Sequence, residues 1–250
     1  MTGASSGIGR ALAEHYAARG AQLGLVARRP QLLHELSARW PRRVRAYPLD
    51  VTDAAALRAA AADFIGCVGV PDVVIANAGV SVGTLTEHTE DLEAMRRVMD
   101  VNHFGMAATF SPFIASMRQA ARGRLVGVAS LAGIRGLAGA AAYCASKAAA
   151  ISYLESLRLE LRDSGIRVVT ICPGYVRTAM TEVNQFPMPF LLAADEAAVR
   201  FARVIERGSS YSVVPWQMAV VGKLLRLLPN AVYDRLFASA PRKPRQRPPG

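Results

Sequence analysis

The sequence has little cysteine and no long apolar run, and each shortage excludes a class of protein. Only 3 of the 250 residues are cysteine. Cys67, Cys144 and Cys172 have neither CxxC nor zinc-ligand spacing, which argues against a disulfide scaffold and favours reduced thiols in a cytoplasmic protein. No apolar run reaches the roughly 20 residues that a membrane-spanning helix needs, and no signal-peptide pattern opens the chain. These absences argue against secreted and transmembrane proteins.

Acidic residues are also scarce. There are 19 Asp and Glu against 30 Lys and Arg, which gives a net charge of +11. A basic balance favours an anionic partner, such as nucleic acid, a membrane surface or a phosphorylated cofactor. The sequence contains no basic stripe with interleaved aromatic residues, the pattern typical of proteins that bind single strands. We therefore expect no nucleic-acid partner.

Hydrophobic residues, by contrast, are plentiful, at 52% of the chain against 20% charged residues. This supply is enough for a core and excludes global disorder. The apolar runs are continuous rather than alternating, as in strands of a parallel sheet that is covered on both faces by helices. Strands are predicted at Gln22–Ala27, Val44–Leu49, Asp72–Asn77, Arg124–Ser130, Arg167–Cys172 and Tyr211–Val214. Helices are predicted near Gly9–Arg19, Gln31–Trp40, Asp53–Cys67, Thr89–Ala121, Tyr143–Asp163 and Asp195–Glu206. This order predicts a single doubly wound α/β domain.

The chain opens with the glycine-rich segment TGASSGIG, in which Gly3, Gly7 and Gly9 precede a predicted helix. Glycines at such a place let the backbone turn tightly and approach a pyrophosphate, which the free N–H groups of the helix can bind. A flexible turn is the alternative interpretation. A P-loop is excluded because no Gly-Lys-Ser/Thr follows.

A dinucleotide-binding loop follows a strand, but only Met1 precedes Thr2. In a doubly wound sheet this first strand lies in the centre. Its loss removes about five buried apolar side chains, worth roughly 1.5–3 kcal/mol each. That sum is comparable to the whole net stability of a typical domain, about 5–15 kcal/mol. We therefore expect a sheet without its first, central strand, in a chain truncated at its N-terminus.

Five further segments, together with the glycine loop, resemble the NAD(P)-dependent short-chain dehydrogenase/reductase family. They are ANAG (76–79), VNHFG around Asn102, VASLAG around Ser130, the Tyr143-Cys-Ala-Ser-Lys147 motif and Pro173-Gly174. A lone YxxxK is a weak signal, whereas the combination is highly specific. The resemblance covers about residues 2–215 and implies a Rossmann-type fold.

Tyr143 and Lys147 are four residues apart, so they project from one face of a helix. A tyrosine has an ordinary pKa of about 10, and a neighbouring ammonium lowers it toward the working pH. The resemblance implies that Tyr143 is the general acid/base and that Lys147 lowers its pKa and holds the nicotinamide ribose. It further implies that Ser130 binds the substrate oxygen and that Asn102 positions a proton-relay water. Taken alone, Ser130 and Asn102 are more typical of capping or turn residues than of catalytic ones.

Arg28 and Arg29 follow the second predicted strand, at the place where NAD-preferring relatives carry an acid. An arginine there can bind a 2′-phosphate in bidentate fashion, which favours NADPH over NAD. The alternative is that both arginines are merely solvated, and Ser6 stands where many NADP-dependent relatives have a basic residue. The predicted cofactor site comprises Gly3, Ser5, Ser6, Gly7, Ile8, Arg28, Arg29, Asp50, Val51, Asn77, Ala78, Gly79, Tyr143, Lys147, Pro173, Gly174, Val176 and Thr178.

The segments after Pro173 carry the remaining predictions. By resemblance, residues 175–195 form the substrate flap of the 1–215 domain, and their methionines and aromatics suit an apolar or lipid-like substrate or ordinary packing. Residues 216–240 form an amphipathic helical extension, in which Gly222, Lys223 and Arg226 mark the polar face. Its 216–229 part can cover the pocket, serve an oligomer interface or lie in a membrane interface. Residues 241–250 are predicted to be a disordered basic tail.

Together these patterns predict an NADPH-dependent carbonyl reductase or alcohol dehydrogenase. The alternative is a catalytically silent protein that senses NADP(H). The four histidines have no metal-ligand spacing, so no metal is predicted. The resemblance implies a homodimer or homotetramer, formed through the helices at 89–121 and 143–163. The cysteine pattern favours the cytoplasm, with membrane association left open.

Overall fold

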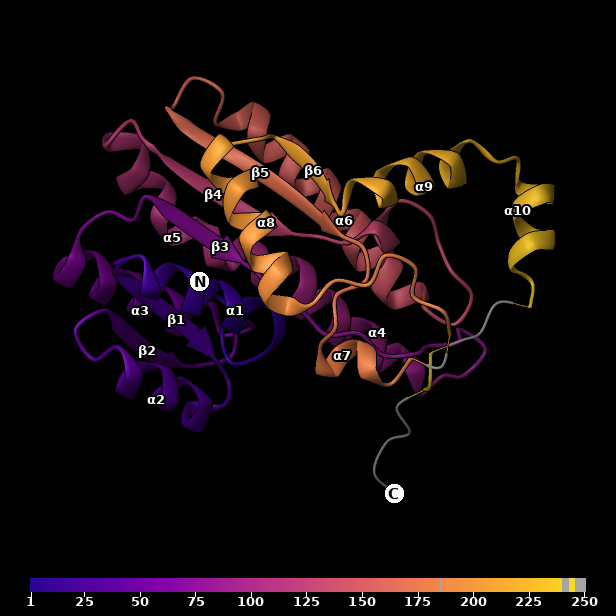
Figure 1. Ribbon diagram of the computed structural model, residues 1–250, viewed down its shortest axis with the longest axis horizontal. Coiled ribbons are helices and arrows are strands. Elements are labelled where there is room, and N and C mark those ends of the chain that lie inside the picture. The colour runs from indigo at the N-terminus through magenta and orange to yellow at the C-terminus, as the bar shows by residue number, and fades with distance from the viewer. Residues whose placement is uncertain (185, 240–242, 246–250) are drawn as a thin grey trace.

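The computed structural model describes residues 1–184, 186–239 and 243–245, and it alternates strands with helices along the chain (Figure 1). The strands are β1 (Leu23–Ala27), β2 (Val44–Pro48), β3 (Val73–Ala76), β4 (Gly123–Val128), β5 (Ile166–Pro173) and β6 (Tyr211–Val214). The helices are α1 (Gly7–Ala18), α2 (Pro30–Arg39), α3 (Ala54–Val68), α4 (Asp91–Met99), α5 (Gly105–Gln119), α6 (Ala141–Glu160), α7 (Ala179–Glu182), α8 (Ala194–Arg207), α9 (Trp216–Leu227) and α10 (Asn230–Phe237). All strand pairs among these are parallel. The predicted α/β class is confirmed.

Helices cover both faces of the sheet because successive side chains of a strand point to opposite sides. Ile75 and Val126 belong to a core cluster with side chains of α1 and α8. Their neighbours Val74 and Leu125 belong to a second cluster with side chains of α5 and α6. This double burial explains why the predicted strands have continuous apolar runs rather than alternating ones.

The sheet is divided into a two-stranded part, β1-β2, and a four-stranded part, β3-β4-β5-β6. Met1 and Thr2 connect the two parts. Thr2 N donates to the Ile75 oxygen at 2.9 Å, and Val26 N donates to the Met1 oxygen at 2.8 Å. Among the described residues, no strand joins β1 to β3, and the predicted truncation of the chain stays a prediction.

A cavity of about 530 Å³, here called the gap cavity, lies beside Met1 between β1 and β3. Its lining is largely apolar and includes Leu23 of β1, Val73 of β3 and the ring of Phe64. The Met1 ammonium donates to the Gly24 oxygen at 2.7 Å. Burial lowers the pKa of this ammonium from 8.0 to about 5, because a charge is costly to hold away from water.

The long helix predicted over 89–121 is divided in the structure. A π-helical turn, Asp100–Phe104, separates α4 from α5. Such turns are rare and frequently occur at functional sites. This turn carries Asn102, whose side chain is completely buried.

The C-terminal region departs from the sheet, and α9 and α10 extend away from the body of the molecule (Figure 1). None of the helices within the described ranges is long and apolar enough to cross a membrane. Of the tail predicted to be disordered, residues 243–245 lie against the body. Residues 241, 242 and 246–250 lie outside the described residues, and the predicted domain bounds stay a prediction.

Candidate active site

A second cavity, of about 280 Å³, lies where β1, β3, β4 and β5 end and is here called the cleft. Ligands of doubly wound proteins bind at this edge of the sheet. All eighteen residues of the predicted cofactor site line the cleft, and so does Ser130. Asn102 does not line it and lies buried behind it. The structure thus brings segments from the whole 3–178 stretch to one place.

The glycine-rich loop forms the floor of the cleft next to the N-terminus of α1. Gly3 and Gly7 have positive φ angles of 68° and 54°, a conformation that disfavours other residues. A Cβ on Gly9 would lie 2.1 Å from the Gly3 oxygen, so only glycine permits this contact between helix and loop. Asn77 fixes the loop through its Nδ2, which donates to the oxygens of Thr2 and Gly3 at 3.2 Å each. The free N–H groups of α1 thereby face a space that fits a pyrophosphate.

Two arginines stand at the other end of the loop. Arg29 Nη2 donates to the hydroxyls of Ser5, at 3.0 Å, and Ser6, at 2.8 Å. Arg28 Nη1 lies 3.8 Å from the Asp50 carboxylate. Ser6, where the sequence departs from many NADP-dependent relatives, here helps to hold a guanidinium against the cleft. This end of the cleft is therefore cationic and fits a phosphate.

Tyr143, Lys147 and Ser130 meet at the opposite end of the cleft. Tyr143 and Lys147 lie one turn apart on α6, and the Lys147 Nζ is 5.9 Å from the centre of the Tyr143 ring. The Nζ donates to the Val128 oxygen at 2.9 Å. Ser130 follows β4 and caps a short 3₁₀ turn, accepting a hydrogen bond from Ala132 N at 3.2 Å. The predicted phenol, amine and hydroxyl are thus gathered at one end of a single cavity.

The pKa values at this end differ in part from the expectation. Burial raises the pKa of Tyr143 above its ordinary value, and a hydrogen bond with Ser130 opposes that rise. Burial also lowers the pKa of Lys147 to about 8. The prediction that Lys147 brings the pKa of Tyr143 below its ordinary value is wrong for this structure, because burial outweighs the other influences on the phenol.

Asn102 has a structural task that the sequence does not reveal. Its Oδ1 accepts from Val80 N at 2.8 Å, and its Nδ2 donates to the Val80 oxygen and to Ser146 Oγ at 2.9 Å each. A Cβ on Gly79 would lie 3.3 Å from this Oδ1 and 3.5 Å from the Lys147 Nζ. Asn102 therefore fixes the chain after β3 to α6, close to Lys147, while its role in proton relay stays a prediction.

Sequence reasoning missed two residues that support the cleft. Thr2 Oγ1 accepts hydrogen bonds from the backbone N–H groups of Asn77, at 3.2 Å, and Ala78, at 3.3 Å. Ser146 accepts from Asn102 and donates to the Tyr143 oxygen at 2.8 Å. Both lie inside segments that the sequence singled out, TGASSGIG and YCASK, so position within a motif was the available signal.

Helix α9 packs one face against the loop that follows Ser130. A Cβ on Gly222 would lie 2.8 Å from the side chains of Leu131 and Ile134, so glycine lets the helix approach this loop closely. The sequence placed Gly222 on the polar face of the helix. That assignment is wrong, because the missing side chain makes this position the point of closest packing.

Comparisons with known proteins show which family the chain resembles. Residues 1–186 match the model of the short chain dehydrogenase family. A Myxococcus xanthus protein described as an uncharacterized oxidoreductase is 44% identical over 241 residues, which cover 94% of this chain and 93% of that protein. The mouse dehydrogenase/reductase SDR family member 7B is 34% identical over 189 residues, which cover 72% of this chain and 58% of that protein.

Two solved structures are similar over nearly the whole chain. A short-chain dehydrogenase from Streptomyces avermitilis has a TM-score of 0.79 and 31% identity, with 94% of this chain and 93% of that chain covered. A short-chain dehydrogenase from Sphingobium yanoikuyae, solved in complex with NADPH, has a TM-score of 0.78 and 27% identity. There the coverage is 96% of this chain and 95% of the other.

Proposed function

Because the chain belongs to the short chain dehydrogenase family and is an oxidoreductase acting on alcohol and carbonyl groups, we propose that it is an NADPH-dependent carbonyl reductase for apolar substrates. The observation that carries this proposal is the cleft itself. It has a guanidinium pair at one end and a phenol, an amine and a hydroxyl at the other. The binding of NADPH by the Sphingobium yanoikuyae relative lends support.

The residues of the cleft suit the parts of a dinucleotide. The glycine loop and the N-terminus of α1 would hold the pyrophosphate. Arg29, fixed by Ser5 and Ser6, would bind the 2′-phosphate together with Arg28. Lys147 would hold the ribose hydroxyls next to the nicotinamide. When bound, NADPH supplies the hydride that reduces a carbonyl carbon.

Tyr143 would supply the proton. A phenol whose pKa lies above its ordinary value is protonated at neutral pH, which is the state that a general acid requires for carbonyl reduction. Ser130 would hold the carbonyl oxygen beside this phenol. Lys147, with a pKa of about 8, can exchange protons close to neutrality and so help to restore the proton on Tyr143.

The walls of the cleft support an apolar substrate. Val80, Val176 and Met180 line it beside the catalytic end, and Met180 belongs to the predicted flap. Methionine adapts to irregular apolar shapes, which suits a lipid-like ketone. A silent NADP(H) sensor would bind the cofactor equally well, but it would not need Tyr143, Lys147 and Ser130 together at one end of the cavity.

The test is a panel of carbonyl compounds that includes long-chain ketones, assayed with NADPH and with NADH. We expect carbonyl-dependent oxidation of NADPH, faster than that of NADH, with the highest kcat/KM for apolar ketones. Binding of NADPH without turnover of any compound would favour the sensor. Failure to bind either nucleotide would contradict both functions.

The outward face of α9 adds a finer proposal, contact with an anionic membrane surface. Trp216, Val220, Leu224 and Leu227 are exposed along this helix, and Leu227 keeps 80% of its surface accessible. Lys223 and Arg226 are exposed beside them. An apolar stripe with basic neighbours is typical of helices that lie in a membrane interface. Co-flotation with phosphatidylserine vesicles, lost in Leu227→Glu, would support this contact, whereas self-association without flotation would assign the stripe to an oligomer interface.

A further inference from the structure

Three residues near the end of the chain, Lys243–Arg245, lie against the segment after β3 and against α7, and they are here called the strap. Lys243 Nζ donates to Ser81 Oγ at 3.0 Å and to the Met180 oxygen at 3.2 Å. Gly83 N donates to the Pro244 oxygen at 3.1 Å. The strap thus connects the chain after β3 with α7, two segments that do not follow one another in sequence.

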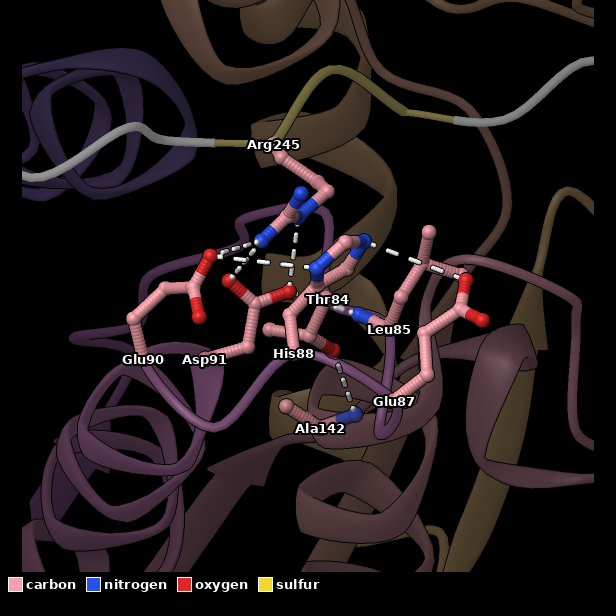
Figure 2. A network of polar contacts seen from close by, with 8 residues as sticks. All are labelled: Thr84, Leu85, Glu87, His88, Glu90, Asp91, Ala142 and Arg245. Atoms are coloured by element: carbon pink, nitrogen blue, oxygen red, sulfur yellow. Dashed lines mark hydrogen bonds and ion pairs between the residues drawn. The ribbon is translucent and has the colours of Figure 1, made fainter.

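Arg245 anchors the strap (Figure 2). Its Nε and Nη2 donate to the two oxygens of Asp91 at 2.9 and 3.0 Å, and Nη2 also donates to Glu90 at 3.0 Å. Asp91 is only 3% exposed, and it also accepts from Leu85 N at 2.7 Å. Bidentate pairs of this kind are stronger and more specific in geometry than neutral hydrogen bonds.

The strap fits against Gly83 without space for a side chain. A Cβ on Gly83 would lie 2.2 Å from the Lys243 oxygen and 2.7 Å from the Pro244 oxygen. An alanine at this position would therefore displace the strap while leaving each of its charges in place. The substitution Gly83→Ala therefore opens the strap by a steric clash, independently of Arg245.

The segments that the strap touches also contribute residues to the lining of the cleft. Val80, next to Ser81, lines the cleft, and so does Met180. Thr84, next to Gly83, accepts a hydrogen bond from Ala142 N at 3.3 Å, one residue before Tyr143 (Figure 2). On the side of the segment after β3, the strap contacts Ser81, which is one residue away from the cleft-lining Val80. On the side of α7, it contacts Met180, which itself lines the cleft.

From these contacts we propose that the strap is the outer wall of the substrate entrance and that it limits the size of the substrates that enter. Arg245 is a positioning residue, because it holds the strap where Lys243 contacts both Ser81 and Met180. Small carbonyl compounds pass beneath the strap, whereas bulky ones require it to be released. This inference rests on the proposed carbonyl reductase function.

The test compares a small ketone with a bulky one in the wild-type chain, Arg245→Ala and Gly83→Ala. Both variants should raise kcat/KM for the bulky ketone at least fivefold, through a lower KM. They should leave kcat/KM for the small ketone and the Kd of NADPH unchanged. Arg162→Ala is the matched control, since Arg162 is an exposed arginine that lies 3.7 Å from Asp163 outside the cleft. It should behave as wild type.

A second measurement does not depend on turnover. Because Gly83 N donates to the strap, hydrogen exchange at this amide should be faster in Arg245→Ala than in wild type or Arg162→Ala. Equal exchange, or faster exchange without a change in the ratio of bulky to small substrate, would overturn the proposal. If the wild-type chain reduces no ketone, the carbonyl reductase function fails instead, and exchange at Gly83 still shows whether the strap is docked.

Discussion

Two cavities of the molecule, the cleft of about 280 Å³ and the gap cavity of about 530 Å³, differ in the side chains that line them. In the cleft, charged groups converge and have partners: Lys147 donates to Val128, and Arg29 donates to two serines. In the gap cavity the lining is largely apolar, and the buried hydroxyl of Tyr16 has no hydrogen-bond partner among the residues described. The gap cavity thus shows no comparable set of converging charged groups in the part of the chain that the structure describes, while the cleft is the candidate site. Convergent polar groups, rather than volume, distinguish a site.

Replacing a tyrosine by phenylalanine should lower activity in the cleft and raise stability in the gap cavity. Tyr143→Phe removes the proposed proton donor, so we expect kcat to fall by about 10²–10⁴-fold, the usual contribution of a general acid. Tyr16→Phe removes a hydroxyl without a partner, whose burial costs about 1–3 kcal/mol, so the protein should become more stable with its activity unchanged. Steady-state kinetics and urea unfolding measure the two effects. If both variants lost activity equally, the two cavities would not differ in function as we propose.

The gap cavity should also impose a pH dependence on the stability of the 1–250 chain. The pKa of the Met1 ammonium is about 5 in the folded state and near 8 when unfolded. Between these values the unfolded state binds more protons, so the free energy of unfolding should rise as pH rises from 5 to 8. The rise from this group is at most about 4 kcal/mol.

Urea unfolding across this pH range measures the rise, and the N-terminally acetylated chain is the control. Acetylation removes the titrating amine, so the contribution of Met1 should disappear while that of every other group remains. The same rise with and without acetylation would place its cause elsewhere in the molecule.

Arg29 tests the cationic end of the cleft. Because charged hydrogen bonds contribute about 1.5–3 kcal/mol, Arg29→Ala should weaken NADPH binding by about 10–100-fold and leave NADH binding nearly unchanged. Arg19→Ala, which lies outside the lining of the cleft, should affect neither nucleotide. Fluorescence titrations measure both Kd values, and an equal loss for the two nucleotides would mean that Arg29 does not read the 2′-phosphate.

Filling the gap cavity should have the smallest effect. Ala60 lines this cavity, and Ala62 is exposed on the same helix, α3. Ala60→Leu should stabilise the fold by about 1 kcal/mol, as cavity-filling changes commonly do, and Ala62→Leu should change little. Thermal unfolding measures the difference. A destabilised Ala60→Leu would show that the cavity has no room for the larger side chain.

Much of the fold could be predicted from the sequence because its signals are local. The apolar run at 73–76 indicated a strand buried on both faces, and β3 covers those residues. The four-residue spacing of Tyr143 and Lys147 fixed their shared helical face, which α6 provides.

The remaining features depend on contacts that have no local signature. Asp91 and Arg245 are 154 positions apart, and neither belongs to a motif. The π-helical turn at Asn102 follows no change in apolar periodicity, so the pattern at 89–121 predicted one continuous helix. The direction of the Tyr143 pKa shift depends on how deeply the phenol is buried, which the spacing of two residues does not determine.

The central claim is that the cleft joins an NADPH site to a proton donor for carbonyl reduction. Its most direct test is incubation of the protein with NADPH deuterated at the transferable C4 position and a long-chain ketone. The account predicts one deuterium on the carbinol carbon of the product, and labelled product formed about 10²–10⁴-fold more slowly by Tyr143→Phe. Unlabelled alcohol, or equal labelling by Tyr143→Phe, would contradict it.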